Sequence, residues 1–280
     1  MSCTVHSVPI RGFLETSFID WKGRLSSVLF TGGCNFRCPF CHNAELVLHH
    51  DAMEEIPLEH IILNLRKYKK WVDRIVITGG EPTIHMDLFH MIGQIKAEGI
   101  KVKLDTNGSS PFVLKGLVND GLIDYVAMDV KGPVDRYKRW CGVDINTKNI
   151  EESIQFILEG KVDYEFRMTV VPFLHREDDV YEAAEYIRYA KRFTIQEFRP
   201  HNTLDPSYAN IKPFSPDKVA KIRENVEQIM TGNSQRAVAN SGHNMASEEH
   251  AAPGPGHTAV SHQQPATKNP CISIPDTNRR

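Results

Sequence analysis

The chain has 280 residues, of which 41% are apolar and 24% are charged, and its formal net charge is −2. This balance is typical of a globular protein with one large core, and it gives no general attraction to nucleic acid or to an anionic membrane surface. No apolar run approaches the roughly 20 residues that span a bilayer, and residues 1–15 lack the apolar segment of a secretion signal, so we expect a cytoplasmic protein.

Apolar runs and helical periodicities alternate between residues 11 and 230. Residues 11–24 alternate apolar and polar side chains and turn at residues 20–23, so we expect a short hairpin leading into the first core strand. Six strands and the helices between them are then predicted from hydrophobic periodicity. The strands are Ser26–Thr31, Arg74–Thr78, Lys101–Asp105, Asp124–Val130, Glu165–Val171 and Thr194–Arg199. The helices are Pro57–Tyr68, one from Leu88 that ends at Gly99, Pro111–Asn119, Asn149–Glu159, Glu177–Lys191 and Pro216–Met230.

Strands that alternate with helices in this way are typical of a parallel sheet covered by helices. Six such units are fewer than the eight of a closed barrel, so we predict an α/β fold with an open, partial (βα)6 barrel and an N-terminal hairpin. Residues 231–280 contain no aromatic residue and are rich in Gly, Pro, Ser, Ala, Asn and His. Such a segment cannot bury enough apolar surface to offset the entropy cost of ordering. We therefore predict a folded domain over residues 1–230 and a disordered tail over residues 231–280.

Three cysteines stand close together after the apolar run Leu25–Phe30. They are Cys34, Cys38 and Cys41, spaced C-x3-C-x2-C. Thiolates at such short spacing can converge on one soft metal centre, and iron–sulfur clusters are held by such cysteines. A cluster of four irons with three protein ligands leaves one iron open for another ligand.

Zinc is the alternative metal. A further alternative is that the three cysteines are unrelated residues of one loop and bind no metal. A closed zinc site needs a fourth ligand, which only His42 or the pair His49-His50 offers nearby. The other three cysteines are scattered along the chain. In a chain without a secretion signal, this distribution indicates a metal site in a reducing compartment rather than disulfides.

Polar or flexible residues also stand where the other predicted strands end, and functional residues gather at this end of α/β barrels. Paired glycines let a ligand approach the backbone, and a carboxylate beside them accepts hydrogen bonds from an ammonium group. Arg167 lies inside an apolar strand and needs an anionic partner. The alternatives are a helix-starting carboxylate, an Asn-Gly turn, a solvated ion pair and a structural histidine. The residues concerned are Gly79, Gly80, Glu81, Asp105, Asn107, Asp129, Lys131, Arg167 and His201.

The three cysteines, with the aromatic Phe40 directly before the third, resemble the signature of the radical S-adenosylmethionine (SAM) superfamily. The continuation into His42-Asn43 resembles the branch of that superfamily that activates glycyl-radical enzymes. Within the branch, Glu15–Trp21 and Phe30–Asn43 are most similar to anaerobic ribonucleoside-triphosphate reductase activating proteins. The resemblance covers residues 11–230 and leaves out the tail.

The resemblance implies an oxidoreductase with one [4Fe–4S] cluster on Cys34, Cys38 and Cys41 and with SAM as its second cofactor. Reductive cleavage of SAM would give a 5′-deoxyadenosyl radical that takes hydrogen from a glycine of a partner enzyme, with no side chain acting as catalytic acid or base. An electron donor of the flavodoxin or ferredoxin type is also implied. The implied SAM contacts are Phe40, His42, Gly79, Gly80, Glu81, Asp105, Asn107, Asp129, Lys131, Arg167 and His201.

The substrate is the part of this interpretation with the most alternatives. The preferred partner is the anaerobic ribonucleoside-triphosphate reductase, and the next is another glycyl-radical enzyme, such as one of the formate-lyase type. A radical SAM enzyme that acts on a small molecule, for example in making a deazapurine, is a third reading. A metal-binding module without catalytic activity is the fourth. No cysteine-rich insert lies between Cys41 and Gly79, so we expect no auxiliary cluster.

Overall fold

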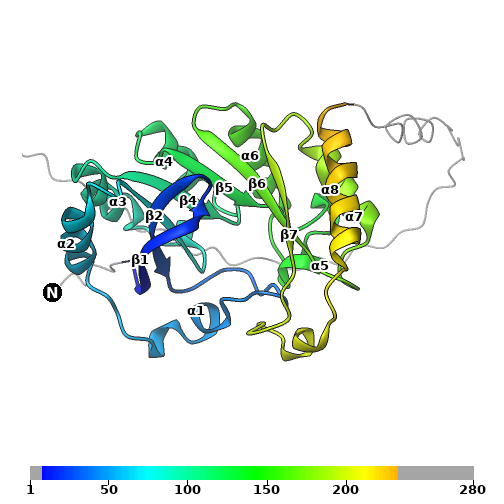
Figure 1. The fold of residues 1–280 in the computed structure, drawn as a ribbon, viewed down its shortest axis with the longest axis horizontal. Coiled ribbons are helices and arrows are strands. Elements are labelled where there is room, and N and C mark those ends of the chain that lie inside the picture. The colour runs from blue at the N-terminus through cyan, green and yellow to red at the C-terminus, as the bar shows by residue number, and fades with distance from the viewer. Residues whose placement is uncertain (1–7, 233–280) are drawn as a thin grey trace, which may run out of the picture. The chain divides into compact units, whose positions relative to one another are not determined.

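Seven strands form one sheet and lie in it in the order of the chain (Figure 1). β1 (Ile10–Trp21) pairs antiparallel with β2 (Arg24–Thr31), and every later pairing is parallel. The later strands are β3 (Arg74–Gly79), β4 (Lys101–Thr106), β5 (Tyr125–Asp129), β6 (Asp163–Val170) and β7 (Phe193–Glu197). The predicted half-barrel of six parallel strands is confirmed, and the predicted hairpin is formed by β1 together with the first core strand itself.

The computed structural model describes residues 8–232, and all of them belong to one compact unit. The predicted disordered tail lies outside the described residues, apart from residues 231 and 232. Within residues 8–232, no helix is long and apolar enough to cross a membrane.

All six predicted helices are present. The differences are that α7 ends earlier than predicted and that two short helices, α1 and α5, were not predicted. α8 begins at Pro216, where the hydroxyl of Ser215 accepts a hydrogen bond from the Lys218 amide and caps the helix. α7 ends at Tyr186, before the predicted Lys191, because tighter i→i+3 turns follow it. α1 and α5 were not predicted, since they are too short to show a period. The helices are α1 (Ala44–Leu48), α2 (Leu58–Tyr68), α3 (Leu88–Ala97), α4 (Pro111–Asn119), α5 (Lys138–Cys141), α6 (Thr147–Leu158), α7 (Glu177–Tyr186) and α8 (Pro216–Met230).

Side-chain alternation along the strands separates an apolar face from a charged face. Ile75 and Ile77 of β3 pack into the large core with the helices, whereas Val76 between them belongs to a small cluster on the opposite face. The same period of two places charged side chains of the neighbouring strands on the face without helices. These side chains are Lys103 and Asp105 of β4, Asp129 of β5, and Glu165 and Arg167 of β6.

The carboxyl ends of the parallel strands meet at one edge of the sheet, which is the lower edge in Figure 1. The loop after β2 leads there into α1, and α5 lies at the same edge. Backbone hydrogen bonds tie the neighbouring strand ends together, as in the bond from Gly80 N to Thr31 O at 2.8 Å. Residues that are far apart in the sequence therefore share this edge.

Candidate functional site

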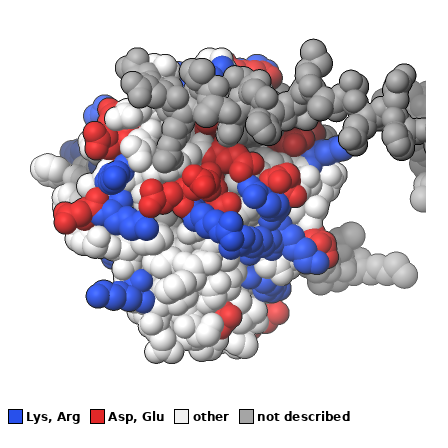
Figure 2. All heavy atoms as spheres, turned by 90° about the vertical axis from the view of Figure 1, so that its right-hand side faces the viewer, with Lys and Arg blue, Asp and Glu red and all other residues white. Residues whose placement is uncertain are grey.

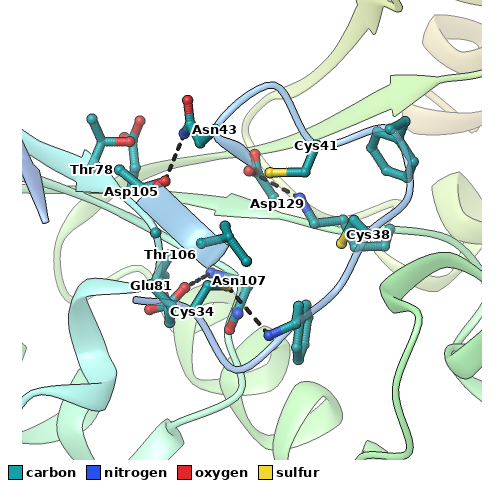
Figure 3. Close-up of a pocket in the computed structure, with 16 residues that line it drawn as sticks. Cys34, Cys38, Cys41, Asn43, Thr78, Glu81, Asp105, Thr106, Asn107 and Asp129 are labelled. Atoms are coloured by element: carbon teal, nitrogen blue, oxygen red, sulfur yellow. Dashed lines mark hydrogen bonds and ion pairs between the residues drawn. The ribbon is translucent and has the colours of Figure 1, made fainter. Parts of the chain in front are cut away.

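A cavity lies between the cysteine loop, residues 34–41, and the carboxyl ends of β3, β4 and β5 (Figure 3). All three motif cysteines line this cavity. The predicted SAM-contacting residues that also line it are Phe40, Gly79, Gly80, Glu81, Asp105, Asn107, Asp129 and Lys131. The fold thus brings predicted residues from four separate segments to one cavity. The predicted residues His42, Arg167 and His201 are not among the lining residues.

The cysteine loop is held in place by backbone hydrogen bonds to distant segments. These segments are the start of the turn after β3, the end of α5, and the loop after β7. The bonds run from Glu81 N to Gly33 O (2.8 Å), from Arg37 N to Cys141 O (2.8 Å), from Leu204 N to Cys41 O (2.9 Å) and from Asp205 N to Pro39 O (2.9 Å). Because three parts of the fold fix the loop, the positions of its thiols depend on the whole domain.

The thiols lie in a buried environment next to a cation. Burial raises the pKa of Cys34 and Cys38 to about 12 and also raises the pKa of Cys41. The ammonium group of Lys131 acts in the opposite direction on all three, and Asp129 lies beside Cys41 (Figure 3). Without a metal the thiols are therefore protonated, and a metal ion must displace their protons.

The donor set fits an iron–sulfur cluster better than a single zinc ion. No three His, Cys, Asp or Glu side chains within residues 8–232 are placed to hold one ion, although all three cysteines line one cavity. A zinc ion needs four ligands around one point, whereas the thiolates of a cluster bind different irons and stand apart. None of the histidines considered as a fourth ligand, His42 and the pair His49-His50, lines the cavity. His42 instead contacts Arg199 O through its Nε2 at 2.6 Å. Three thiols without a fourth ligand match a cluster with one iron open.

The paired glycines after β3 are required by the chain itself. Gly79 has φ +114°, and a Cβ atom there would lie 2.5 Å from the backbone N and O of Thr31. A Cβ atom on Gly80 would lie only 1.8 Å from Gly33 O. The missing side chains therefore let β2, β3 and the cysteine loop approach closely. The expectation from sequence was close approach of a ligand, and the structure adds this reason for the glycines.

We expect Gly80→Ala to lower the free energy of unfolding by about 2 kcal/mol and to reduce iron binding, because Gly33 must move away and shift the cysteine loop. The matched control is Gly93→Ala in α3, where a Cβ atom meets nothing within 4 Å. That variant should gain roughly 0.5–1 kcal/mol, since alanine favours the helix. Urea unfolding and iron analysis measure both effects, and equal behaviour of the two variants would contradict the steric argument.

Glu81 is almost fully buried, and its carboxylate accepts four hydrogen bonds from the chain. Oε1 accepts from Thr83 N (3.1 Å), Thr83 Oγ1 (2.6 Å) and Thr106 Oγ1 (2.7 Å), and Oε2 accepts from Asn107 N (2.6 Å). Burial raises the pKa of Glu81, and these hydrogen bonds oppose the rise. The carboxylate thus starts the short helix Pro82–Ile84. Oε2 carries only one of the four bonds and keeps a lone pair for an ammonium group.

Five charged side chains of alternating sign form a network across β4, β5 and β6, which we call the charge network: Lys103, Asp105, Arg167, Asp129 and Lys131. Arg167 donates to Asp129 Oδ1 through Nε (2.8 Å) and to Asp105 Oδ2 through an η-nitrogen (3.0 Å). The ammonium groups of Lys103 and Lys131 lie 3.3 Å from Asp105 Oδ1 and 3.2 Å from Asp129 Oδ2. Burial alone would raise the pKa of Asp129, but Arg167 and Lys131 outweigh it and hold the pKa at about 2. The two cations therefore stabilise the charged form of Asp129.

The remaining predicted residues lie at the border of the site. The partners of Arg167 belong to the protein, so contact between Arg167 and SAM stays a prediction. The rings of His42 and His201 are stacked, with centroids 5.5 Å apart, and both residues are exposed. The side-chain oxygen of Asn107 accepts from Ser109 N at 2.9 Å, which is the Asx turn considered as its alternative, and its amide nitrogen donates to Asn35 at 3.0 Å.

Several residues of the site were not predicted from the sequence. Thr83 and Thr106 donate hydrogen bonds to Glu81, and Lys103 pairs with Asp105 within β4. Lys103 could have been found from the sequence, because a charged side chain within a buried strand needs a partner, as is also the case for Arg167. No sequence signal marks the threonines, whose role depends on which strand ends are neighbours.

Comparison with known proteins gives a consistent family assignment. The model of the radical SAM superfamily matches residues 28–187. A protein of Methanocaldococcus jannaschii, described by its name as a glycyl-radical enzyme activating enzyme, is 34% identical over 210 residues, which cover 72% of this chain and 85% of that protein. The pyruvate formate-lyase-activating enzyme of Streptococcus mutans is 26% identical over 229 residues, which cover 74% of this chain and 86% of that enzyme.

A solved structure shows the same fold. SuiB of Streptococcus suis, in a crystal structure with bound S-adenosylmethionine, superposes with a TM-score of 0.56. The match covers 71% of this chain and 46% of SuiB, at 17% sequence identity. At this identity the likeness concerns the fold alone.

Proposed function

The chain belongs to the radical SAM superfamily and is therefore an enzyme, and we propose that it activates a glycyl-radical enzyme by taking hydrogen from a backbone glycine of that partner. The observation that carries the proposal is the cavity shared by the three motif cysteines and the strand-end residues. The relative from Methanocaldococcus jannaschii, which matches over most of its length, supports the activating branch. The enzyme class is that of an oxidoreductase.

Cys34, Cys38 and Cys41 are proposed to hold one [4Fe–4S] cluster, with SAM bound beside it. Together, the bound cluster and SAM supply one-electron cleavage of SAM and the radical chemistry that removes hydrogen. Cys38 and Phe40 are buried, and so is Phe36 next to them. These side chains form an apolar wall that keeps water away from the thiols.

The charged groups of the cavity suit the amino-acid part of SAM. Its ammonium group needs acceptors, and the chain offers Glu81 Oε2, which accepts one hydrogen bond. Asp105 Oδ1 is a second acceptor, since it is buried and accepts no hydrogen bond, although Lys103 Nζ lies 3.3 Å away. Its carboxylate needs a cation, and Lys131 lines the same cavity. No side chain has to move a proton in this reaction, so we assign no catalytic acid or base. His42 and His201 are proposed to contact the rest of SAM.

The proposed partner is the anaerobic ribonucleoside-triphosphate reductase, and the electron donor is a flavodoxin or ferredoxin. The support for the reductase is the similarity of Glu15–Trp21 and of the Cys-His-Asn continuation to its activating proteins. Glu15–Trp21 lies in β1, at an edge of the sheet, and Phe18 and Ile19 in it are 76% and 87% exposed. A partner could therefore reach this segment. The second candidate is a formate-lyase-type enzyme, favoured by the similarity to the Streptococcus mutans enzyme.

The partner assignment is tested by mixing the reduced, cluster-loaded protein anaerobically with SAM and each candidate enzyme. We expect an EPR doublet of a glycyl radical on the ribonucleotide reductase, and none with Cys38→Ala, because that variant lacks one ligand to the cluster. A doublet on the formate-lyase-type enzyme alone would select the second candidate. Turnover of a small molecule without a doublet on any protein would refute the activating function.

A further inference from the structure

A second cavity, of about 380 Å³, lies at the end of the parallel strands opposite the cysteines. Its residues stand in the turn between β1 and β2 or at the start of a parallel strand. They are Trp21, Lys22, Arg24, Arg74, Lys101, Asp124, Tyr125, Asp163 and Arg192. We call it the basic cavity, and none of its residues lines the cysteine site.

The basic cavity has an excess of positive charge in a chain whose net charge is −2. Five of its residues are cationic and two are carboxylates, and both carboxylates already have cationic partners. Asp124 accepts from Lys96 Nζ at 2.7 Å, and Asp163 accepts from Arg192 at 3.0 Å. Asp73, which does not line the cavity, pairs with Arg74 at 2.7 Å, so the cations left without a paired carboxylate among the described residues are Lys22, Arg24 and Lys101.

Three exposed cations around the cavity lack a close anionic contact in the described part of the chain, although the pKa of Asp73 is lowered by its hydrogen bond with Arg74 and also by the charge of Lys101. Within residues 8–232, the side chains of Lys22, Arg24 and Lys101 make no hydrogen bond or ion pair. On the face with α7 and α8, by contrast, cations and carboxylates adjoin (Figure 2), as in the pair Lys218–Glu177 at 3.2 Å. Gathering unpaired like charges around one hollow is unfavourable unless an anion binds there.

Two arginines of the cavity stack on aromatic rings and are also paired. Arg74 pairs with Asp73 through Nε (2.7 Å) and one η-nitrogen (3.2 Å), and Arg192 pairs with Asp163, so that only part of each guanidinium is free. The guanidinium carbon of Arg74 lies 5.1 Å from the ring centre of Trp21, and that of Arg192 lies 5.4 Å from the ring centre of Tyr125. Stacking on a ring leaves the N–H groups at the edge of a guanidinium available. Arg192 Nε is buried and has no hydrogen-bond acceptor, which is costly unless a ligand supplies one.

We propose that the basic cavity binds a small anion that carries phosphate groups. Phosphate is the anion that best matches arginine forks and several clustered cations, because it offers many acceptor oxygens and more than one charge. The walls include two aspartates, which disfavour an extended polyanion such as duplex DNA. Binding would join the β1–β2 turn to the starts of the parallel strands. This inference is independent of the cluster and of the proposed activity.

The test is isothermal titration of the full chain, with its cluster reconstituted anaerobically, at low ionic strength. Tripolyphosphate and ATP are titrated separately, so that phosphate recognition is distinguished from recognition of a base by the rings. We expect both to bind, and Arg24→Ala and Lys101→Ala each to weaken binding roughly tenfold, the effect of one lost charge-assisted contact. Lys221→Ala, an exposed lysine of α8, is the matched control and should bind as tightly as the unmodified chain.

Hydrogen exchange gives a second readout that is independent of activity. Tripolyphosphate should slow amide exchange in the β1–β2 turn, residues 20–25, and leave α8 unchanged. Tighter binding of ATP than of tripolyphosphate would show that the rings contribute and would support the site. The proposal would be refuted if neither tripolyphosphate nor ATP bound at millimolar concentration. It would also be refuted if Arg24→Ala and Lys101→Ala bound them as tightly as the unmodified chain does, or if duplex DNA bound more tightly than ATP.

Discussion

Replacing Cys38 with alanine should abolish both iron binding and SAM cleavage. Cys38 is 7% exposed and lines the cavity together with the other two motif cysteines. A cluster held by three thiolates loses a third of its protein ligands in this variant. Among residues 8–232, no cysteine outside the motif lines the cavity to replace Cys38. After anaerobic reconstitution, iron and sulfide should fall to background, and dithionite-reduced protein should release no 5′-deoxyadenosine from SAM.

The matched control is Cys141→Ala. Cys141 is fully buried, and its thiol donates to Val143 O at 3.2 Å. Its carbonyl holds the Arg37 amide, and this backbone bond survives the substitution. We expect normal iron content and a loss of about 1 kcal/mol in stability from the small cavity created. Loss of iron to the same extent in both variants would contradict the assignment, and so would stoichiometric zinc that reconstitution cannot displace.

The sheet was predictable because parallel strands are buried on both faces and read as apolar runs. The predicted strand Arg74–Thr78 corresponds to β3, in which Ile75, Val76 and Ile77 are fully buried. Ser215 followed by proline at the first helical position predicted the start of α8. By contrast, α1 and α5 have five and four residues, which is too few to show a helical period.

The sequence indicated which strand ends lie near the cysteines, but not how the side chains there pair with one another. Strand ends of a parallel sheet meet at one edge, so sequence alone places Glu81, Asp105 and Asp129 near the cysteines. Arg167 was correctly expected to need an anion, but its two partners are fixed by the neighbouring strands β4 and β5. Such pairings depend on strand order and register, which a single sequence does not contain.

Removing Arg167 should cause the largest loss of stability of any single charge. Arg167→Ala leaves Asp105 and Asp129 facing each other without the cation between them. Breaking a fully buried pair on one side typically costs 3–5 kcal/mol. We expect a loss of about 3 kcal/mol, because the side chains of Arg167 and Asp129 are 15% and 31% exposed. Lys103 and Lys131 also still pair with the two carboxylates. Urea unfolding at pH 7 should show this as a lower midpoint.

The matched control is Arg136→Ala. Arg136 also contacts carboxylates, with Glu182 at 2.6 Å and Asp135 at 3.3 Å, but its side chain is 46% exposed. Exposed ion pairs contribute little, so this variant should lose less than about 1 kcal/mol. If Arg136→Ala and Arg167→Ala lost similar amounts of unfolding free energy, the lower exposure of Arg167 would not explain its contribution to stability.

The pH dependence of the Arg167→Ala defect separates charge from packing. In the unmodified chain the pKa of Asp129 is about 2, below its unfolded value of about 4, so its stabilisation is present above pH 4 and is lost as the pH falls toward 2. In Arg167→Ala the main cation beside Asp129 is gone and burial favours its protonated carboxyl, so the pKa of Asp129 rises. Protonation of this carboxyl then removes the repulsion in the variant as the pH falls from 7 to 5. The difference in unfolding free energy between the unmodified chain and Arg167→Ala should therefore become smaller. A difference that stays constant over this range would instead assign the defect to lost packing of the arginine side chain.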